Sequence, residues 1–405
     1  MIAVSHPTGN TFVRALVYAL EREQLLSRFF TTLTTPTDTI LGLFPPPLRG
    51  QLARRAFDLP REKITTHPLR EAVRLLANAA GVKSITRHGG WASVDAVYEN
   101  LDRAVASWIE KHPPQFDVIH CYEDGAEKTF RAAERAGIKR IYELPIAYWE
   151  TVREILQEEA ARLPEWEPTL YATGDTPEKL ARKTREINLA DVVVCPSKFV
   201  YDSLPETIRL AKKCAVAKFG SPAPPAPAPR LAPGKLRILF AGAMSQRKGL
   251  ADLFAAMKLL DRPDIELVVL GTPILPMKFY REQFTGFIHE APRPHQAVMQ
   301  LMQSCDVLAL PSLVEGRALV QQEALACGLP LVVSANAGAE DLVEEGKTGF
   351  LVPVRSPEKI AERIAWFADH RDGLPAMREA ARDKAAQYSW DDYTRAIIEA
   401  AGTQA

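Results

Sequence analysis

Two glutamates and two adjacent cations in this sequence have types and spacing suited to a polar, charged ligand. Glu315 and Glu323 lie eight positions apart in EGRALVQQEALACGLP, and Arg247-Lys248 precede a glycine in LFAGAMSQRKGL. Adjacent cations beside a helix N-terminus form an anion site, for which a diphosphate is a natural ligand. Carboxylates and unpaired amides at a helix start bind the hydroxyls of a polyol.

Each of these residues also has an ordinary structural explanation. Arg247-Lys248 can be a surface pair, and Glu315 can simply compensate a helix dipole. Glu323 can be a charge on a helix surface. The segment HEAPRPHQAVMQLMQSCD, which starts at His289, reads as a strand end, a turn and a helix that would wall the same crevice.

The elements that must position these residues are short, continuously apolar runs, which indicate parallel strands covered on both faces. Those in the first half are expected at Ile2–Val4, Asp117–His120, Lys139–Leu144 and Asp191–Cys195. Those in the second half are expected at Leu236–Gly242, Ile265–Gly271, Gly286–His289, Asp306–Leu310, Leu329–Ser334 and Gly349–Val352. Helices alternate with them, for example over Leu250–Leu260 and from about Ala318 to Cys327. The pattern predicts an α/β chain with doubly wound sheets.

A proline-rich stretch divides the chain into two similar halves. The run SPAPPAPAPRLAPGK at 221–235 cannot form a helix or a central strand and predicts a semi-rigid connector. We therefore expect domains at 1–220 and 236–387, followed by a C-terminal helix at 388–405. Residues 42–108 are interpreted as a solvated helical excursion of the first domain, with a contact to an acceptor or a membrane surface as the alternative.

Composition narrows the class of protein. The chain has 405 residues, and its 50 Lys+Arg balance its 50 Asp+Glu, which argues against nucleic acid as the main partner. The five cysteines are scattered, as expected of reduced thiols in the cytosol. No apolar run is long enough for a membrane span, although attachment to a membrane surface stays open.

The second half resembles the donor domain of retaining family-4 glycosyltransferases. The resemblance is carried by RKG after a glycine-ended strand, by PSLVEGRALVQQEALACGLPLVVSANAGAEDLVEEGKTGFLV and by the closing YSWDDYTRAI. It implies a glycosyltransferase B fold, in which two Rossmann-like domains face each other across a cleft. It covers the second half well and the first half weakly.

The resemblance also implies roles for individual residues. Glu315 would bind hydroxyls of the donor sugar, together with the backbone amides of Gly316, Arg317, Ala318 and Leu319. Glu323 would bind the ribose, Arg247 and Lys248 would hold the diphosphate, and Gly242 would end the strand beside it. The backbone near Ile288 and His289 would contact the base, and the C-terminal helix would pack back on the first domain.

Two positions depart from the family pattern. Arg317 and Ala318 replace an aromatic residue and a glycine; Arg317 either contacts a phosphate or carboxylate of an unusual donor or faces solvent. Relatives carry a histidine near the end of the strand that reads RIYELPIAYWE here, where Glu143 or Leu144 stands. Glu143 is either a catalytic replacement or a structural residue, and His120 is the second candidate.

The first strand-to-helix turn adds two donor-side candidates. Gly9 lets the backbone approach a diphosphate, and Asn10 can contact the donor or simply cap the helix.

These observations predict a cytoplasmic, metal-independent hexosyltransferase without a bound cofactor. Its donor would be a UDP- or GDP-sugar, its acceptor a glycan, lipid or small molecule, and polysaccharide assembly its setting by analogy. A phosphorylase or nucleotide-sugar epimerase of similar shape is the alternative among enzymes. A catalytically inactive nucleotide-sugar sensor or assembly subunit is the alternative outside them.

Overall fold

Two parallel sheets form the framework of the computed structural model, which describes residues 1–35, 50–52, 55–113, 115–226 and 234–402. The first is seven-stranded, with the order β3-β2-β1-β4-β5-β6-β7. Its strands are β1 (Ile2–Ser5), β2 (Leu26–Thr31), β3 (Ile64–Thr66), β4 (Val118–Tyr122), β5 (Lys139–Glu143), β6 (Val192–Cys195) and β7 (Lys213–Val216). The four strands predicted in this half are confirmed, whereas β2, β3 and β7 were missed.

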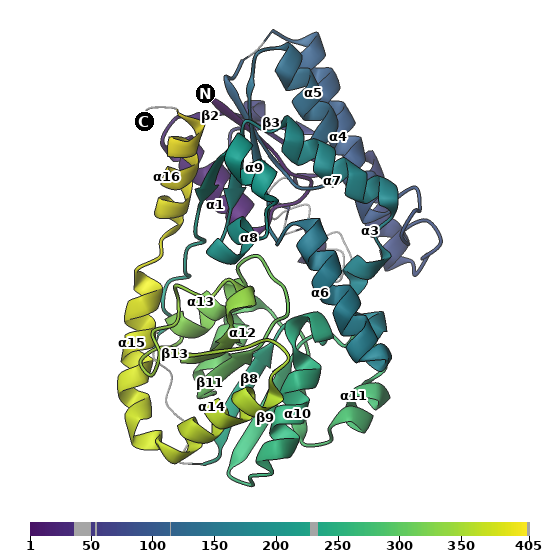
Figure 1. Ribbon diagram of the computed structural model, residues 1–405. Coiled ribbons are helices and arrows are strands. Elements are labelled where there is room, and N and C mark those ends of the chain that lie inside the picture. The colour runs from purple at the N-terminus through teal and green to yellow at the C-terminus, as the bar shows by residue number, and fades with distance from the viewer. Residues whose placement is uncertain (36–49, 53–54, 114, 227–233, 403–405) are drawn as a thin grey trace.

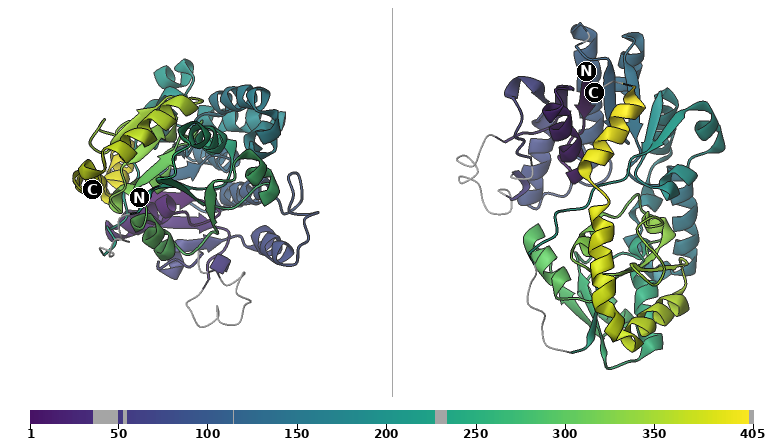
Figure 2. Two further views of the ribbon diagram at one scale, coloured as in Figure 1. Left: turned by 90° about the horizontal axis from the view of Figure 1, so that it is seen from below. Right: turned by 90° about the vertical axis from the view of Figure 1, so that its left-hand side faces the viewer.

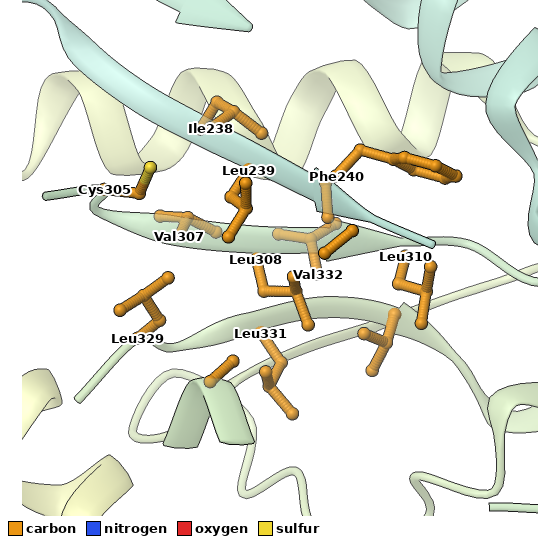
Figure 3. Packing of buried hydrophobic residues seen from close by; sticks show 14 of the residues in the cluster. Ile238, Leu239, Phe240, Cys305, Val307, Leu308, Leu310, Leu329, Leu331 and Val332 are labelled. Atoms are coloured by element: carbon orange, nitrogen blue, oxygen red, sulfur yellow. The ribbon is translucent and has the colours of Figure 1, made fainter. Parts of the chain in front are cut away.

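The second sheet is six-stranded, with the order β10-β9-β8-β11-β12-β13. Its strands are β8 (Leu236–Ala241), β9 (Ile265–Leu270), β10 (Phe287–Glu290), β11 (Val307–Leu310), β12 (Leu331–Ser334) and β13 (Gly349–Val352). All six strands predicted in this half are confirmed to within two residues at each end. The apolar runs of β8, β11 and β12 stack their side chains in the core, as Figure 3 shows for Leu239, Leu308 and Leu331.

Helices cover both faces of each sheet (Figure 1). Those of the first half are α1 (Thr11–Arg22), α3 (Leu69–Ala79), α4 (Val94–Lys111), α5 (Glu127–Arg135), α6 (Trp149–Arg162), α7 (Pro177–Leu189), α8 (Lys198–Asp202) and α9 (Glu206–Ala211), with 3-10 turns η2 (Arg61–Lys63), η3 (Pro164–Thr169) and η4 (Tyr171–Gly174). Those of the second half are α10 (Leu250–Leu260), α11 (Met277–Gln283), α12 (His295–Gln303), α13 (Leu319–Ala326), α14 (Pro357–Asp369), α15 (Leu374–Ala386) and α16 (Trp390–Ala401), with turns η5 (Gln246–Lys248), η6 (Ala335–Ala337) and η7 (Arg371–Gly373). Within the described ranges, none of these helices combines the length and apolarity needed to cross a bilayer.

The two ends of the chain meet on the first domain. Helix α15 lies along the second domain, and α16 continues onto the first, where it packs against α1 (Figure 2, right). Tyr393 and Ile397 of α16 are fully buried in the same apolar cluster as β1. The expected connector at 221–235 lies partly outside the described residues, and so does the expected excursion at 42–108, whose described part includes β3, α3 and α4.

Helix α6 and turn η3, which together span residues 149–169 and which we call the strap, reach from the first domain onto the second (Figure 1). Trp166 of the strap is buried in the core of the second domain, where its ring lies edge-on to those of Phe254, Phe279 and Tyr280. The first half of the sequence therefore completes the apolar core of the second half.

Candidate active site

A cavity of about 490 Å³ opens between the two sheets, at the carboxyl ends of their strands. This is where open parallel sheets bind their ligands. Both halves of the chain line it: Phe12, Pro145, Ile146, Phe219, Ala241, Gly242, Arg247, Lys248, Leu270, Val298, Glu315, Gly316, Arg317, Ala318, Leu319 and Val320. Eight of the residues predicted from the sequence are among them: Gly242, Arg247, Lys248, Glu315, Gly316, Arg317, Ala318 and Leu319.

The charged centre of the cavity is a carboxylate between two cations. Lys248 donates from Nζ to Glu315 Oε1 at 2.6 Å, and Arg247 Nη1 lies 3.1 Å from Glu315 Oε2. Burial alone would raise the pKa of Glu315, but the two cations outweigh it and hold that pKa below its ordinary value. Glu315 is therefore a carboxylate near neutral pH, held between two basic side chains.

Glycines allow the loops around this centre to approach one another. Gly242, with φ of 151°, lies under the Lys248 side chain, and a Cβ there would come within 2.6 Å of Lys248 Cδ. Gly249, with φ of 76°, packs so closely that a Cβ would lie 2.1 Å from the carbonyl oxygen of Pro311. The turn that carries the two cations is thus pressed against the loop that carries Glu315.

The strap also contacts η5 (Gln246–Lys248), which carries the two cations and which we call the cation turn. Gln246, which precedes Arg247, is fully buried; its Nε2 donates to Glu159 Oε1 at 2.6 Å and to Asp252 Oδ2 at 2.7 Å. The backbone N–H of Gln246 donates to Thr169 Oγ1 at 3.0 Å. Glu159 and Thr169 belong to the strap, so a first-half segment fixes the position of the second-half cations.

The start of α13 meets the first domain directly. A Cβ on Gly316 would lie 1.7 Å from the carbonyl oxygen of Pro145, and Ser197 Oγ donates to Gly316 O at 2.6 Å. The expectation that the amides of Gly316 to Leu319 are all unpaired is wrong at Ala318, whose N–H donates to Ala337 O at 3.2 Å. The turn at η6 comes close enough to take this amide.

Arg317 does not face solvent as one interpretation expected. Its side chain is completely buried, and Nη1 donates to Asp341 Oδ1 at 2.8 Å. The guanidinium lies 5.0 Å from the centre of the Tyr388 ring. Burial raises the pKa of Asp341, but Arg317 and Lys218 lower it further, to about 2. The guanidinium is thus held by Asp341 and Tyr388, beside the segment that leads from α15 to α16. Any contact of Arg317 with a donor would then come from its backbone.

Glu323 and Ile288 lie outside the described lining of the cavity. Glu323 is one turn further along α13 than Leu319; burial raises its pKa, and His295 Nδ1 lies 3.7 Å from its Oε1. Ile288 is 41% exposed on the edge strand β10. The roles predicted for both residues, at the ribose and the base, stay predictions.

Glu143 and His120 lie in the core of the first domain. His120 Nε2 is 2.8 Å from Glu143 Oε2, and both side chains are buried. Tyr393 of α16 donates its hydroxyl to both carboxylate oxygens of Glu143, at 2.9 Å each. The structure brings neither residue to the described lining, and the contacts of Glu143 match the structural interpretation.

Gly9 and Asn10 precede α1, and they too lie outside the described lining. Asn10 is the N-cap residue of α1, and a Cβ on Gly9 would collide with the Phe57 ring at 2.5 Å. The close approach that Gly9 permits is therefore to a side chain of its own domain. The same helix supplies Phe12 to the cavity instead.

Sequence reasoning missed the wall that the first domain contributes. Phe12 and Phe219 stack with ring centres 5.1 Å apart, and Pro145 and Ile146 continue the wall. Pro145 and Ile146 follow the strand end at which the family histidine was sought, so the signal was present one or two positions away. For the two phenylalanines, far apart in the chain, the sequence holds no comparable signal.

Comparisons with known proteins match the second half of the chain to a described protein family. Residues 226–386 match the family described as Glycosyl transferases group 1. Among curated proteins, a D-inositol 3-phosphate glycosyltransferase of Corynebacterium urealyticum is 36% identical over 108 residues, 27% of this chain and 26% of that protein. The chain thus aligns with about a quarter of that relative's length.

Solved structures share the whole architecture. The sucrose-phosphate synthase of Thermosynechococcus elongatus superposes with a TM-score of 0.67 at 18% identity, covering 98% of this chain and 97% of that one. The Anabaena protein HepE in complex with UDP-glucose gives 0.56 at 17% identity, covering 98% of both chains. The predicted pair of Rossmann-like domains in the glycosyltransferase B arrangement is confirmed; membership of family 4 stays a prediction.

Proposed function

We propose that this chain, whose residues 226–386 are a group 1 glycosyl transferase domain, transfers a hexosyl unit from a nucleotide-diphosphate sugar to an acceptor. The observation that carries the proposal is the pairing of Arg247 and Lys248 with Glu315 in a cavity between the two sheets. The UDP-glucose held by the Anabaena neighbour supports a UDP-sugar donor, with a GDP-sugar as the alternative. The acceptor would be a glycan, a lipid or a small molecule.

The geometry suggests how the residues would act. The donor's phosphate oxygens would accept hydrogen bonds from Lys248 and Arg247, which would release Glu315 to accept from the sugar hydroxyls. As the bond between the anomeric carbon and the diphosphate breaks, the two cations would stabilise the negative charge on the leaving group. The acceptor oxygen would attack from the same face and pass its proton to the departing phosphate, so that the configuration is retained.

We further propose that transfer needs no metal ion and no other cofactor, because the two cations supply the charge that a metal would provide. A cytoplasmic location is supported by the five cysteines, all within the described ranges and all free thiols. Contact with the inner membrane face would bring a lipid-linked acceptor within reach.

A sensor of nucleotide sugars is the second candidate. It is favoured by one observation: within the described lining, the first domain contributes only Phe12, Pro145, Ile146 and Phe219, while Glu143 and His120 are buried elsewhere. A sensor would bind one donor tightly and release no nucleotide with any acceptor.

The test is nucleotide release by the purified protein across UDP-, GDP- and ADP-sugars, with slow hydrolysis as the background reaction. We expect release from one donor in EDTA, and its loss in Lys248→Ala, which removes a charge-assisted contact of about 1.5–3 kcal/mol. Lys258→Ala is the matched control, since Lys258 is exposed on the neighbouring helix α10. Restoration of lost activity by magnesium would contradict the metal-free mechanism, and a donor that binds without turnover would select the sensor.

A further inference from the structure

One segment of the first domain exposes an unusual number of apolar side chains. Five of the eleven exposed large apolar residues in the described part of the chain fall within residues 69–94, a stretch that we call the 69–94 surface. They are Leu69 (65% exposed), Leu76 (58%), Val82 (44%), Trp91 (48%) and Val94 (56%). Exposed apolar residues are ordinary when scattered, but a gathered set indicates a contact surface.

The fold brings these residues together. Leu69 and Leu76 are seven positions apart on α3, which is about two turns, so they share one face of the helix. Arg70 lies over the Trp91 ring at 5.0 Å from its centre and donates to Ala96 O at 3.3 Å. These contacts place Trp91 and the start of α4 beside the first turn of α3. Figure 1 and the left view of Figure 2 show α3 and the following loop projecting from the first domain.

The charges on this surface have one sign. Lys83 and Arg87 are exposed in the loop between α3 and α4. Glu71 is the one acidic residue between positions 69 and 94; it is buried and paired with Arg55 and Arg74. The 69–94 surface is therefore apolar and basic; the adjoining carboxylate, Asp95, is 22% exposed and already lies 3.0 Å from Lys179 Nζ and 3.5 Å from His88 Nδ1.

We propose that the 69–94 surface docks on the anionic face of a lipid membrane. Exposed leucines on a helix with a tryptophan beside them suit the headgroup boundary, where an indole ring is at its most favourable. Exposed lysine and arginine add attraction to anionic lipid. A symmetric pair of chains is a poorer occupant, because it would set Lys83 and Arg87 against their own copies.

The docking does not depend on sugar transfer, although it gives the proposed enzyme access to a lipid-linked acceptor. The surface lies apart from the cavity residues, so binding to vesicles can be measured without donor. A failure to dock would therefore leave the transferase proposal intact, and an inactive protein that docks would leave this proposal intact.

Cosedimentation with vesicles tests the proposal. We expect the full chain to sediment with vesicles of phosphatidylcholine and phosphatidylglycerol, and at least 10-fold less with phosphatidylcholine alone. Leu76→Ser with Trp91→Ser, and separately Lys83→Glu with Arg87→Glu, should each lower binding to the anionic vesicles at least 10-fold. Trp91→Phe, which keeps an apolar ring, should largely preserve it. Leu210→Ser with Leu259→Ser is the matched control, because both leucines are exposed elsewhere, at 80% and 58%.

Several results would overturn the proposal: no binding of the wild type to anionic vesicles, equal loss in the control variant, or equal binding to neutral vesicles. Sedimentation velocity without lipid tests the alternative occupant, a second copy of the chain. Self-association that Leu76→Ser with Trp91→Ser removes would assign the surface to that second copy. Circular dichroism confirms that each variant is folded before its binding is compared.

Discussion

Glu315 accepts hydrogen bonds from the same two cations that we assign to the donor's diphosphate. Its contacts to Lys248 at 2.6 Å and Arg247 at 3.1 Å fill positions that phosphate oxygens would take. A carboxylate and a phosphate therefore compete for one pair of cations, and only a ligand with sugar hydroxyls gives the displaced carboxylate new partners. In the proposed complex, the arrangement would favour the whole donor over the free nucleotide.

Replacing Glu315 separates its competition with phosphate for the two cations from its proposed contact with the sugar hydroxyls. In Glu315→Gln the cations lose their internal competitor, so we expect UDP alone to bind several-fold more tightly. The sugar loses a charge-assisted contact of about 1.5–3 kcal/mol, so turnover of the intact donor should fall. Calorimetry with UDP and with the donor measures both effects. Weaker binding of UDP in this variant would show that Glu315 supports the cation turn instead of competing for it.

The hydroxyl of Tyr393 gives the buried Glu143 carboxylate its hydrogen bonds from α16, and the prediction that follows concerns stability. Tyr393→Phe removes two contacts of 2.9 Å to a buried acid, so unfolding free energy should fall by about 1.5–3 kcal/mol. Urea unfolding measures the loss. Tyr171→Phe is the control, since Tyr171 is 71% exposed. Donor affinity should not change, and a large loss of affinity would favour the catalytic interpretation of Glu143 over the structural one.

At the scale of elements, the strap is what orients the cation turn. Gln246 connects Glu159 of the strap to Asp252 of α10 through one buried amide. We therefore expect Gln246→Ala to shift Arg247 and Lys248 and to weaken donor binding about 10-fold or more, although Gln246 lies outside the described cavity lining. Gln300→Ala, exposed on α12, serves as the control. Unchanged donor affinity in a folded Gln246→Ala variant would show that the turn holds its own shape.

The elements that could be predicted are those whose burial leaves a continuous apolar run. The inner strands β8, β9, β11 and β12 are of this kind. The edge strand β13 also keeps an apolar run, whereas β10 was predicted although only Phe287 of its four residues is buried. Strands β3 and β7 are edge strands of three and four residues, with half-buried or exposed side chains, and edges carry a weak pattern. Strand β2 was missed because Ser27 and Arg28 interrupt its apolar run.

The residues of the candidate site also fall into a group that the sequence could place and a group that it could not. Arg247, Lys248 and Glu315 belong to loops that follow predicted strands, so topology alone brought them together. The partners of Arg317 and Glu143 are Asp341 and Tyr393, which lie far along the chain, and a sequence pattern carries no such pairing. For this reason the sequence left two interpretations of each side chain. In the structure, Arg317 forms an ion pair with Asp341, and Glu143 accepts hydrogen bonds from Tyr393.

For the whole molecule, buried titratable groups make stability depend on pH. Burial raises the pKa of Glu186 to about 8 and that of Glu123 to about 7, while burial lowers the pKa of His6 to about 4. The folded chain therefore holds protons on Glu186 and Glu123 at pH values where the unfolded chain has released them. Stability from these two groups falls as the pH rises from 4.5, the ordinary pKa of a glutamate, through 7 and 8. Stability from His6 changes in the opposite direction: it rises with pH between about 4 and 6.5, because the unfolded chain must first lose the proton that the buried ring does not hold.

We expect the unfolding free energy to fall between pH 6.5 and 8, with a slope of up to about 1.4 kcal/mol per pH unit for each titrating group. Chemical denaturation at intervals of half a pH unit measures the slope. Glu186→Gln removes one of the two groups, so the slope should flatten across the whole window; between pH 7 and 8, where Glu123 has already lost its proton, most of the remaining slope should disappear. A wild-type stability that stays level or rises over this window would contradict the assignment.

The burial of Trp166 against helices α10 and α11 of the second domain has a consequence for chimeras built from relatives of this fold. A junction placed in the proline-rich connector at 221–235 would appear to exchange one domain cleanly for another. It would also replace Trp166, Glu159 and Thr169, so that a foreign strap would meet the rings of Phe254 and Tyr280 and the amide of Gln246. A functional hybrid must therefore inherit residues 149–169 together with the second half, and recombination during evolution faces the same restriction on where two genes can be joined.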